Sequence, residues 1–336
     1  MFKLLWTSVL FLMCPMLPAL ATVEAAALET PRKVELKIYV HDITEIDELA
    51  GQFAIHVLLG SYWQDPTLVS ADTEPRVWRE EAAMEQVNSI WWPMVEFNRR
   101  TEPQALEHTL LRIHPDGRVE FERQMNIRLS TSLDLHKLPF DTQRLKMELE
   151  SFRHLADAVE LSLPDANLHM TKEISLLQWR IGRTTTETKP YFNKVYDETY
   201  SRAIITIEVK RHHQFYIWQM MVPLGILIGM AFAVFFLPPS DLADRINVLI
   251  ASLLTVVALS YSLHTDLPKV PYLTVIDWLF VLAYVFFGLA MAGMVLIHRM
   301  LDNNEARALR LDRRLRWAYP VAYLLVTGCV ILWVTA

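Results

Sequence analysis

One stretch of the chain, Ile246–Leu263, is apolar enough for a membrane helix yet carries polar residues along its length. The polar residues inside it are Asn247, Ser252, Thr255, Ser260 and Ser262, and those flanking it are Asp244, Arg245 and His264. Within a bilayer, such side chains are shielded by neighbouring helices or line a water-filled passage. The pattern therefore favours the movement of water or ions, and a helix buried inside a bundle is the alternative.

Other kinds of chemistry lack the residues they need. The chain has 336 residues with 32 Lys and Arg against 38 Asp and Glu, and its net charge of −6 disfavours a nucleic-acid partner. Cys14 and Cys329 are its 2 cysteines, too few for a disulfide framework or a Cys-based zinc site. His108 and His114 lack the further ligands of a metal site. Its glycines form no phosphate-binding loop, and its Ser, His and acidic residues form no known catalytic arrangement, so we expect neither an enzyme nor a cofactor.

The composition and the N-terminus both point to a membrane. Hydrophobic residues make up 52% of the chain and charged residues only 21%. Lys3, the apolar run Leu4–Leu20 and small residues up to Ala21 predict a signal peptide over residues 1–21. A membrane anchor is the alternative, although Pro15 and Pro18 interrupt the run.

The region 22–213 has the pattern of a soluble β-rich domain. Apolar and polar residues alternate in Val34–Val40, Leu145–Glu150 and Ile205–Lys210, as in strands with one buried face. His114–Arg118, with Pro, Asp and Gly in sequence, is a turn signal between apolar runs. The sequence therefore predicts an extracellular all-β, immunoglobulin-like sandwich.

The region 214–336 has the composition of a membrane domain. Its uncharged stretches are Phe215–Leu237, Ile246–Leu263, Trp278–Ile297 and Trp317–Ala336. Each is close to the roughly 20 residues that cross a bilayer core as a helix. We expect a four-helix transmembrane bundle with helices at about 214–237, 242–264, 274–298 and 315–336.

The connection between the third and fourth stretches is rich in arginine. Its arginines are Arg299, Arg307, Arg310, Arg313, Arg314 and Arg316. Such a concentration of positive charge marks the cytoplasmic side. A signal peptide places the β domain outside, and four crossings return Ala336 to that side. We therefore expect a multi-pass protein of the cell inner membrane, with its N-terminal domain and C-terminus extracytoplasmic.

Several short segments carry a family resemblance. In chain order they are Trp63-Gln64-Asp65-Pro66-Thr67-Leu68, Trp91-Trp92-Pro93, Leu138-Pro139-Phe140-Asp141-Thr142-Gln143, Arg211 with Phe215-Tyr216 and Pro223, and Leu267-Pro268-Lys269-Val270-Pro271-Tyr272. From about Val34 to its end, the chain resembles the pentameric ligand-gated ion channels, the Cys-loop receptor family, in its bacterial branch. The signature cysteines of that family would fall at Thr131 and Leu145, so this signature loop is not closed covalently.

The resemblance implies a homopentamer around a central pore, with the second helix of each subunit facing the axis. Its partners would be four identical subunits, membrane lipid, permeant cations and a small-molecule agonist. The implied pore-lining residues, spaced 3-4-3-4-3, are Asp244, Asn247, Ala251, Leu254, Ala258 and Tyr261. From the residues alone, the side that carries Ser252, Thr255 and Ser262 could face water instead.

The resemblance also implies a selectivity site and a gate in this row. Five Asp244 carboxylates at the cytoplasmic mouth would concentrate cations. Arg245 opposes this interpretation, but neighbours on a helix point about 100° apart, so both cannot face the axis. Cation-selective members of the family carry an acid before a basic residue here; simple capping of the helix is the alternative. Leu254 is predicted to form a hydrophobic gate, reinforced at Tyr261.

An agonist site between subunits is implied as well. Its implied residues are Glu96, Phe97, Asn98, Glu150, Phe152, Tyr191, Tyr196 and Tyr200, with Leu58 on the complementary strand. Aromatic faces together with the carboxylates of Glu96 and Glu150 suit a cationic amine. Leu58 stands where the family usually has an aromatic residue, which weakens the expected cage.

Binding would be coupled to the pore at the junction of the two domains. Arg211 is expected to pair with Asp141 of the signature loop and with Glu45 of the first hairpin loop. These loops would press on the linker after the pore helix, at Pro268 and Lys269. A half-buried charge cluster between domains can act as a two-position switch, and a static clamp is the alternative.

Three other functions stay open. His212, His213 and His264 could change charge near neutral pH, so protons are a second candidate stimulus. A membrane-anchored periplasmic enzyme or binding protein, or a non-conducting receptor of this fold, is the main rival to a channel. A transporter is disfavoured because transporters typically carry internal repeats and more helices.

Overall fold

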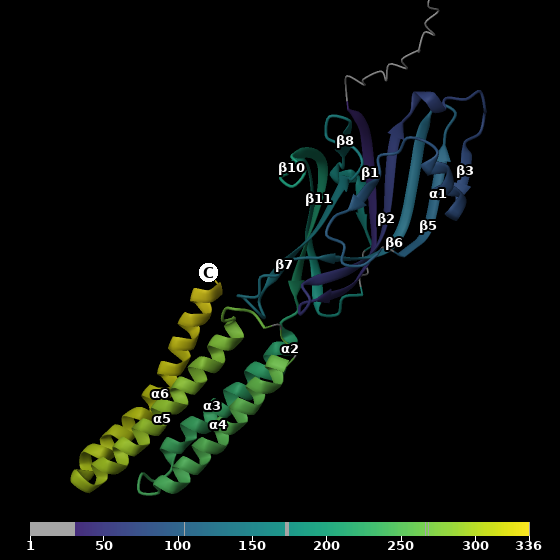
Figure 1. Cartoon of the computed structure of the whole chain (residues 1–336). Helices are drawn as coiled ribbons and strands as arrows, with labels where there is room; N and C mark the ends of the chain where they lie inside the picture. The colour runs from purple at the N-terminus through teal and green to yellow at the C-terminus, as the bar shows by residue number, and fades with distance from the viewer. Residues whose placement is uncertain (1–30, 104, 172–174, 266, 268, 336) are drawn as a thin grey trace, which may run out of the picture.

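The computed structural model describes residues 31–103, 105–171, 175–265, 267 and 269–335. The expected signal peptide, residues 1–21, lies outside these residues, as does Pro268. Figure 1 shows two bodies placed end to end, a β-sandwich and a bundle of long helices. The chain passes from the first to the second after β11, which leads directly into α2.

The sandwich consists of two sheets. The larger contains, in spatial order, β3 (Arg76–Arg79), β5 (Ala105–Ile113), β6 (Arg118–Ser130), β2 (Gln52–Gln64), β1 (Arg32–Asp47) and β8 (Val159–Ser162), with β9 (Leu168–Met170) also paired to β1. The smaller contains, in order, β10 (Trp179–Asn193), β11 (Glu198–Arg211), β7 (Thr142–Ser151) and β4 (Val95–Phe97). The short helices of this domain are η1 (Pro66–Leu68), α1 (Glu80–Asn88) and η2 (Asp165–Asn167).

The core of the sandwich follows from the alternation of its strands. In β1, Val34, Leu36, Ile38 and Val40 are fully buried while the residues between them are exposed. Because successive side chains of a strand point to opposite faces, each strand contributes every second residue to the core. The predicted all-β sandwich is confirmed.

The second body contains four helices long and apolar enough to cross a membrane. The first is built from α2 (Gln214–Tyr216), a π-helical segment η3 (Ile217–Met221), α3 (Val222–Ala233) and a 3₁₀ turn η4 (Val234–Phe236). The others are α4 (Leu242–Thr265), α5 (Val275–Asn303) and α6 (Glu305–Thr335). Pro223, which lacks an N–H group, follows the π-helical segment and accounts for the local change of pitch.

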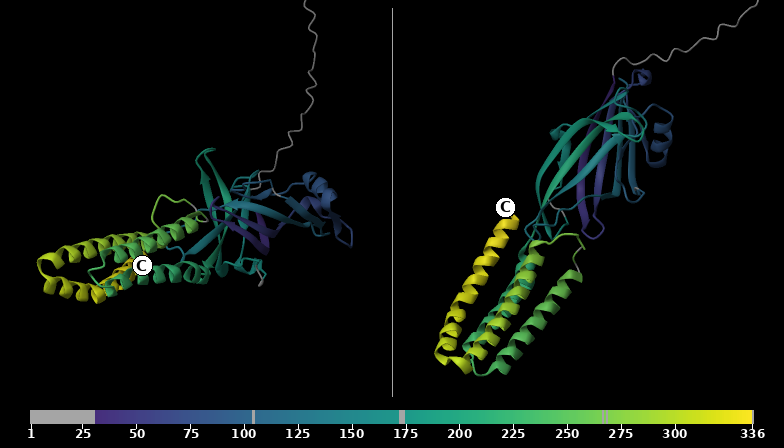
Figure 2. Two further views of the ribbon diagram at one scale, coloured as in Figure 1. Left: turned by 90° about the horizontal axis from the view of Figure 1, so that it is seen from below. Right: turned by 60° about the vertical axis from the view of Figure 1, so that its left-hand side comes forward.

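The four helices run side by side, and α6 ends at the sandwich end of the bundle (Figure 2). The third and fourth helices are longer than the sequence suggested. α5 continues to Asn303, and α6 begins at Glu305, about ten residues before the expected 315. Helical hydrogen bonds do not require apolar side chains, so the helices extend through the arginine-rich segment that lies outside the uncharged stretches.

Candidate functional site

One face of α4 carries the residues expected to line a pore. Asp244, Asn247, Ala251, Leu254, Ala258 and Tyr261 are all exposed in the single chain. Leu254 is 63% exposed and Tyr261 is 78% exposed, although both are large and apolar or aromatic. On the opposite face, Leu249 and Val256 pack into the helical core. The bundle therefore fixes which side of α4 remains available for other subunits.

This packing also separates the residues of the alternative face. Ser252 is buried and donates a hydrogen bond to the carbonyl of Val248 at 2.9 Å. Thr255 is exposed and donates to the carbonyl of Ala251 at 2.9 Å. Because Ser252 lies inside the bundle, the side that carries Ser252, Thr255 and Ser262 does not face water as a unit.

Arg245 points away from the exposed row. It is only 1% exposed, and its Nη1 lies 2.9 Å from Oδ1 of Asp312 on α6. Its guanidinium also donates to the carbonyl of Leu237, which follows the first helix. Asp244 is exposed, so the acid and not the base is presented at this end of α4.

Arg211 is the centre of a buried ion cluster between the two bodies. Its Nε lies 2.7 Å from Oδ1 of Asp141, its Nη2 lies 3.1 Å from Oδ2, and its Nη1 lies 2.6 Å from Oε1 of Glu48. Its guanidinium also stacks over the ring of Trp179, with Cζ 4.2 Å from the ring centroid. Burial alone would lower the pKa of Arg211, but the hydrogen bonds to Asp141 and Glu48 outweigh burial and raise it. Arg211 is therefore permanently charged.

The expected pairing of Arg211 with Glu45 is wrong. Glu45 instead pairs with Arg128 of β6, with 2.9 Å between Arg128 Nη2 and Glu45 Oε2. Glu45 lies within β1, whereas Glu48 lies in the loop after β1, at the end of the sandwich that meets the helices. The acid that reaches Arg211 is therefore the one in the loop.

The signature loop also contacts the linker after α4. The backbone N–H of Leu135 donates to the hydroxyl of Tyr272 at 3.1 Å, and the N–H of Val275 donates to the carbonyl of His136 at 3.1 Å. The rings of His136 and Tyr272 stack with centroids 3.7 Å apart. A cavity of about 320 Å³ lies beside this contact, and exposed Lys269 is among the residues that line it.

Hydrogen bonds close the signature loop without a disulfide. The buried amide of Gln143 accepts from the N–H of Asp134 at 3.0 Å and donates to the carbonyl of Asp134 at 2.6 Å. It also donates to Oδ2 of Asp141 at 2.6 Å. Gln143 thus fixes the carboxylate that holds Arg211.

The expected agonist-binding acids lie next to each other across the smaller sheet. Glu96 of β4 is opposite Glu150 of β7, and Glu150 is opposite Arg202 of β11. Arg202 donates two hydrogen bonds to Oε2 of Glu150, at 3.0 and 2.7 Å, and its guanidinium stacks on Tyr191 at 3.3 Å. A basic group of the chain itself therefore already occupies one face of Tyr191.

Glu96 is likewise engaged within the chain. Its Oε1 lies 2.9 Å from Nη1 of Arg123, and its Oε2 lies 2.8 Å from Nη1 of Arg100. Both expected acids are therefore paired with arginines of the chain itself, Glu96 with Arg123 and Arg100 and Glu150 with Arg202. Phe97 is also corrected as a ligand contact, because it is 1% exposed and belongs to the sandwich core. Asn98, half-buried, accepts from the N–H of Arg99.

The other aromatic residues near this sheet are accessible. Phe152 is 51% exposed and Tyr196 is 67% exposed. The hydroxyl of Tyr200 donates to Oε2 of Glu198 at 2.6 Å, and this bond to a carboxylate raises the pKa of Tyr200 to about 12. Leu58 lies elsewhere, on β2 of the larger sheet, beside a cavity of about 210 Å³. One chain therefore brings all of these residues together except Leu58.

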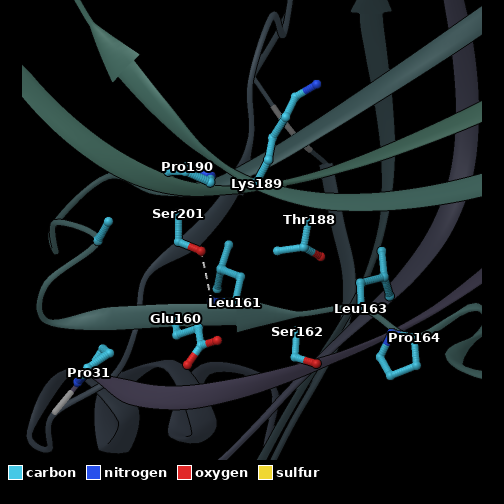
Figure 3. A pocket seen from close by; sticks show the side chains of 11 residues that line it. Pro31, Glu160, Leu161, Ser162, Leu163, Pro164, Thr188, Lys189, Pro190 and Ser201 are labelled. Atoms are coloured by element: carbon cyan, nitrogen blue, oxygen red, sulfur yellow. Dashed lines mark hydrogen bonds between the residues drawn. The ribbon is translucent and has the colours of Figure 1, made fainter.

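A larger cavity, of about 510 Å³, lies between β8 and the β10–β11 hairpin (Figure 3). Its apolar wall includes Leu161, Leu163 and Pro190, and Ser201 Oγ accepts a hydrogen bond from the N–H of Leu161 at 2.9 Å. Pro190 precedes Tyr191 on β10, and adjacent residues of a strand face opposite ways. This cavity is therefore separate from the aromatic residues described above. Among the described residues, no group of three or more His, Cys, Asp or Glu is placed to hold a metal ion.

Comparison with known proteins decides the family. The model of the neurotransmitter-gated ion-channel ligand binding domain matches residues 23–213, more than half of the chain. The chain belongs to the pentameric ligand-gated ion-channel family. This family is not enzymatic, and its members are membrane proteins that assemble as oligomers and respond to small agonists.

The relatives of this channel-family chain are named for different stimuli. It is 24% identical to the proton-gated ion channel of Gloeobacter violaceus, over 88% of this chain and 82% of the relative. It is 27% identical to the gamma-aminobutyric acid receptor subunit theta of Mus musculus, over 85% of this chain and 44% of the relative. It is also 27% identical to the serotonin-gated chloride channel mod-1 of Caenorhabditis elegans, over 84% of this chain and 59% of the relative. The chain thus spans about half the length of these two animal relatives.

Several residues at these sites were missed in the sequence. Tyr272 and Gln143 lay inside the segments that carried the family resemblance, so attention to their polar atoms could have found them. Glu48 was one of several acids near the first hairpin turn, without a local signal to single it out. Asp312 lay among arginines in a segment that was considered only for topology.

Proposed function

We propose that this chain forms a homopentameric, cation-selective channel of the cell inner membrane, opened by a small extracellular agonist. The observation that carries the proposal is the opposite orientation of two neighbours on α4. Asp244 is exposed at the base of the expected pore row, whereas Arg245 is buried against Asp312. In a pentamer, Asp244 would become a ring of carboxylates, which attracts cations and repels anions.

In this proposal, gating is transmitted from the sandwich to α4 through the domain junction. Agonist binding at the outer end of β10 and β11 would move β11, which ends at Arg211. Arg211 holds the signature loop through Asp141, and that loop contacts the linker through Tyr272. The pore row then opens at Leu254, whose apolar side chains exclude water when five of them meet in a narrow ring.

We expect Asp244→Asn to reduce selectivity for cations over anions by about tenfold or more, since it removes a charge of about −5 from one ring. The measurement is the reversal potential in asymmetric KCl, with reconstituted pentamers in planar bilayers. Asp241→Asn is the matched control, because Asp241 is an exposed acid just before α4 and outside the row. Unchanged selectivity in Asp244→Asn, or a wild type that selects anions, would refute the proposed selectivity. A pentamer without current under any stimulus would favour a non-conducting receptor.

We further propose that the agonist is an amine held mainly by aromatic faces. Phe152, Tyr191 and Tyr196 each expose a substantial part of their side chain. A cation over such a face gains roughly 0.5 to 2 kcal/mol. The bonds from Arg202 end on Oε2 of Glu150, so Oε1 is the acceptor we propose for the ammonium group.

Phe152→Ala and Tyr196→Ala are each expected to raise the amine concentration for half-maximal current about two- to thirtyfold, the range of one lost cation–π contact. Phe192→Ala is the control, since Phe192 is an exposed aromatic that alternates with Tyr191 along β10. Equal responses of all three variants would count against this aromatic site. The screen should compare primary amines, amino acids and uncharged analogues at constant pH.

Protons are a second candidate stimulus, favoured by one contact at the extracytoplasmic end of α4. Nε2 of His264 lies 2.7 Å from Oδ1 of Asp277 on α5. Protonation of the imidazole would turn this hydrogen bond into an ion pair between the pore helix and its neighbour. A relative is a proton-gated channel. Current evoked by steps to low pH without any amine, and lost in His264→Gln, would support protons over amines.

A further inference from the structure

A buried ion cluster ties the cytoplasmic end of α4 to α6. We call Arg245, Asp312 and Arg316 the base cluster. Asp312, 3% exposed, accepts from Arg245 Nη1 at 2.9 Å on Oδ1 and from Arg316 Nη2 at 3.2 Å on Oδ2. One carboxylate on α6 thus holds two guanidinium groups, each on its own oxygen atom.

Both guanidinium groups are also bonded to the end of the first transmembrane helix. Arg245 donates to the carbonyl of Leu237, and Arg316 donates to the carbonyl of Phe235 at 3.0 Å and lies over the ring of Phe236 at 4.7 Å. The last carbonyls of a helix lack intrahelical partners and carry partial negative charge, so cations are favoured there. These carbonyls supply only partial charges, and Asp312 is the full negative charge of the base cluster.

Arg245 and Asp244 are adjacent in sequence but face opposite environments. If the long side chain of Arg245 swung out of the bundle to the cytoplasmic mouth, each subunit would add one positive charge near each Asp244 carboxylate. In a pentamer the charge at this level would change from about −5 to about 0. Selectivity therefore depends on the orientation of Arg245 as well as on the presence of Asp244.

We propose that Asp312 is a positioning residue for ion selectivity: it holds the guanidinium of Arg245 inside the bundle and so leaves Asp244 as the charge that ions meet. A buried guanidinium without a counter-charge is unfavourable, and two of them repel each other. Without the Asp312 carboxylate, Arg245 gains by turning to the water at the cytoplasmic mouth. This inference rests on the proposed cation selectivity, and it assigns to α6, which lies outside the expected pore row, a part in that selectivity.

The test compares reversal potentials of reconstituted pentamers in a tenfold KCl gradient. The current through an ideally selective channel reverses at about 59 mV in this gradient. A tenfold concentration ratio corresponds to about 1.4 kcal/mol, and moving one charge across 100 mV corresponds to about 2.3 kcal/mol. Asp312→Asn keeps the shape of the side chain and is expected to lower the cation-to-anion permeability ratio about tenfold. Asp312→Glu is expected to restore much of it, and Asp312→Asn combined with Arg245→Gln is expected to restore the wild-type ratio.

Two controls separate positioning from general damage. Arg316→Gln removes the other guanidinium of the base cluster and should leave the ratio unchanged, because Arg245 keeps its partner. Asp302→Asn removes an exposed acid from the same end of the bundle and should also have no effect. A wild-type ratio in Asp312→Asn overturns the inference, and so does a reduced ratio that persists in the double variant.

The result can be distinguished from failure of the proposed function. If the wild type selects cations and Asp244→Asn lowers the ratio while Asp312→Asn does not, only the present inference fails. If Asp312→Asn assembles but does not conduct, the position of Arg245 in a structure of this variant tests the inference instead. A guanidinium of Arg245 that has left the bundle for the cytoplasmic mouth supports the inference, and one still bonded to the carbonyl of Leu237 overturns it.

Discussion

Arg211→Ala is expected to abolish agonist-evoked current completely while the protein still assembles and binds agonist. The substitution leaves Asp141 and Glu48 without the guanidinium that joins them, and removes the stacking on Trp179. Removing one partner of a buried ion pair costs roughly 3 to 5 kcal/mol, enough to release the signature loop from the last strand. The measurements are single-channel recording and agonist binding on the purified pentamer.

The matched variants use the difference between two nearby acids. Glu48→Gln should lower the maximal response strongly, because Glu48 bonds Arg211, whereas Glu45→Gln should leave it near the wild-type value because Glu45 pairs with Arg128. Arg211→Lys keeps the charge but cannot form the two-point contact with Asp141, so it should gate poorly. Normal gating in Arg211→Ala would show that coupling takes another route. Loss of assembly in every variant would favour a static clamp.

Leu254→Ser is expected to lower the agonist concentration for half-maximal current by about tenfold or more, with some current in the absence of agonist. Five serine hydroxyls would allow water into a ring that five leucine side chains keep dry, so the closed state loses part of its advantage. A tenfold change in this concentration corresponds to a free-energy change of only about 1.4 kcal/mol, to which all five subunits contribute. The measurements are the concentration–response curve and the current that flows in the absence of agonist and is stopped by a pore blocker.

Val257→Ser is the control for this gate. Val257 is 47% exposed on the same helix, one turn from Leu254 but outside the 3-4-3-4-3 row. A serine there removes a similar apolar side chain without wetting the axis. Equal effects of the two substitutions would argue that Leu254 has no special place in the pore. An unchanged curve in Leu254→Ser would remove the gate from this position.

Features that depend on local periodicity could be predicted from the sequence. Alternation in Val34–Val40 identified a strand with one buried face, and the uncharged stretches identified the four membrane helices. Spacing places the row from Asp244 to Tyr261 on one helical face, but the residues alone also allowed the side that carries Ser252, and only the family resemblance chose between the two. The start of the uncharged stretch did not predict the start of α6, because the helical backbone hydrogen bonds continue through the arginine-rich segment before it.

Pairings between distant residues could not be predicted in this way. Arg211 meets Glu48 across 163 residues, and Arg245 meets Asp312 across 67. Several acids near the first hairpin turn have similar sequence surroundings, and only the course of the chain after β1 decides that Glu48 reaches the junction. The arginines that neutralise Glu96 and Glu150 come from β6, β11 and the segment after β4, so the charge of the ligand region also depends on the fold.

The sequence by itself determined the two-part architecture and the membrane helices, because each of these follows from neighbours along the chain. Only the tertiary structure decided which partner each buried charge has. That choice matters because a charge inside a protein is stable only where an opposite charge and hydrogen bonds are brought to it. The direction of Arg245, and with it the charge that an ion would meet at Asp244, is a property of the packed bundle.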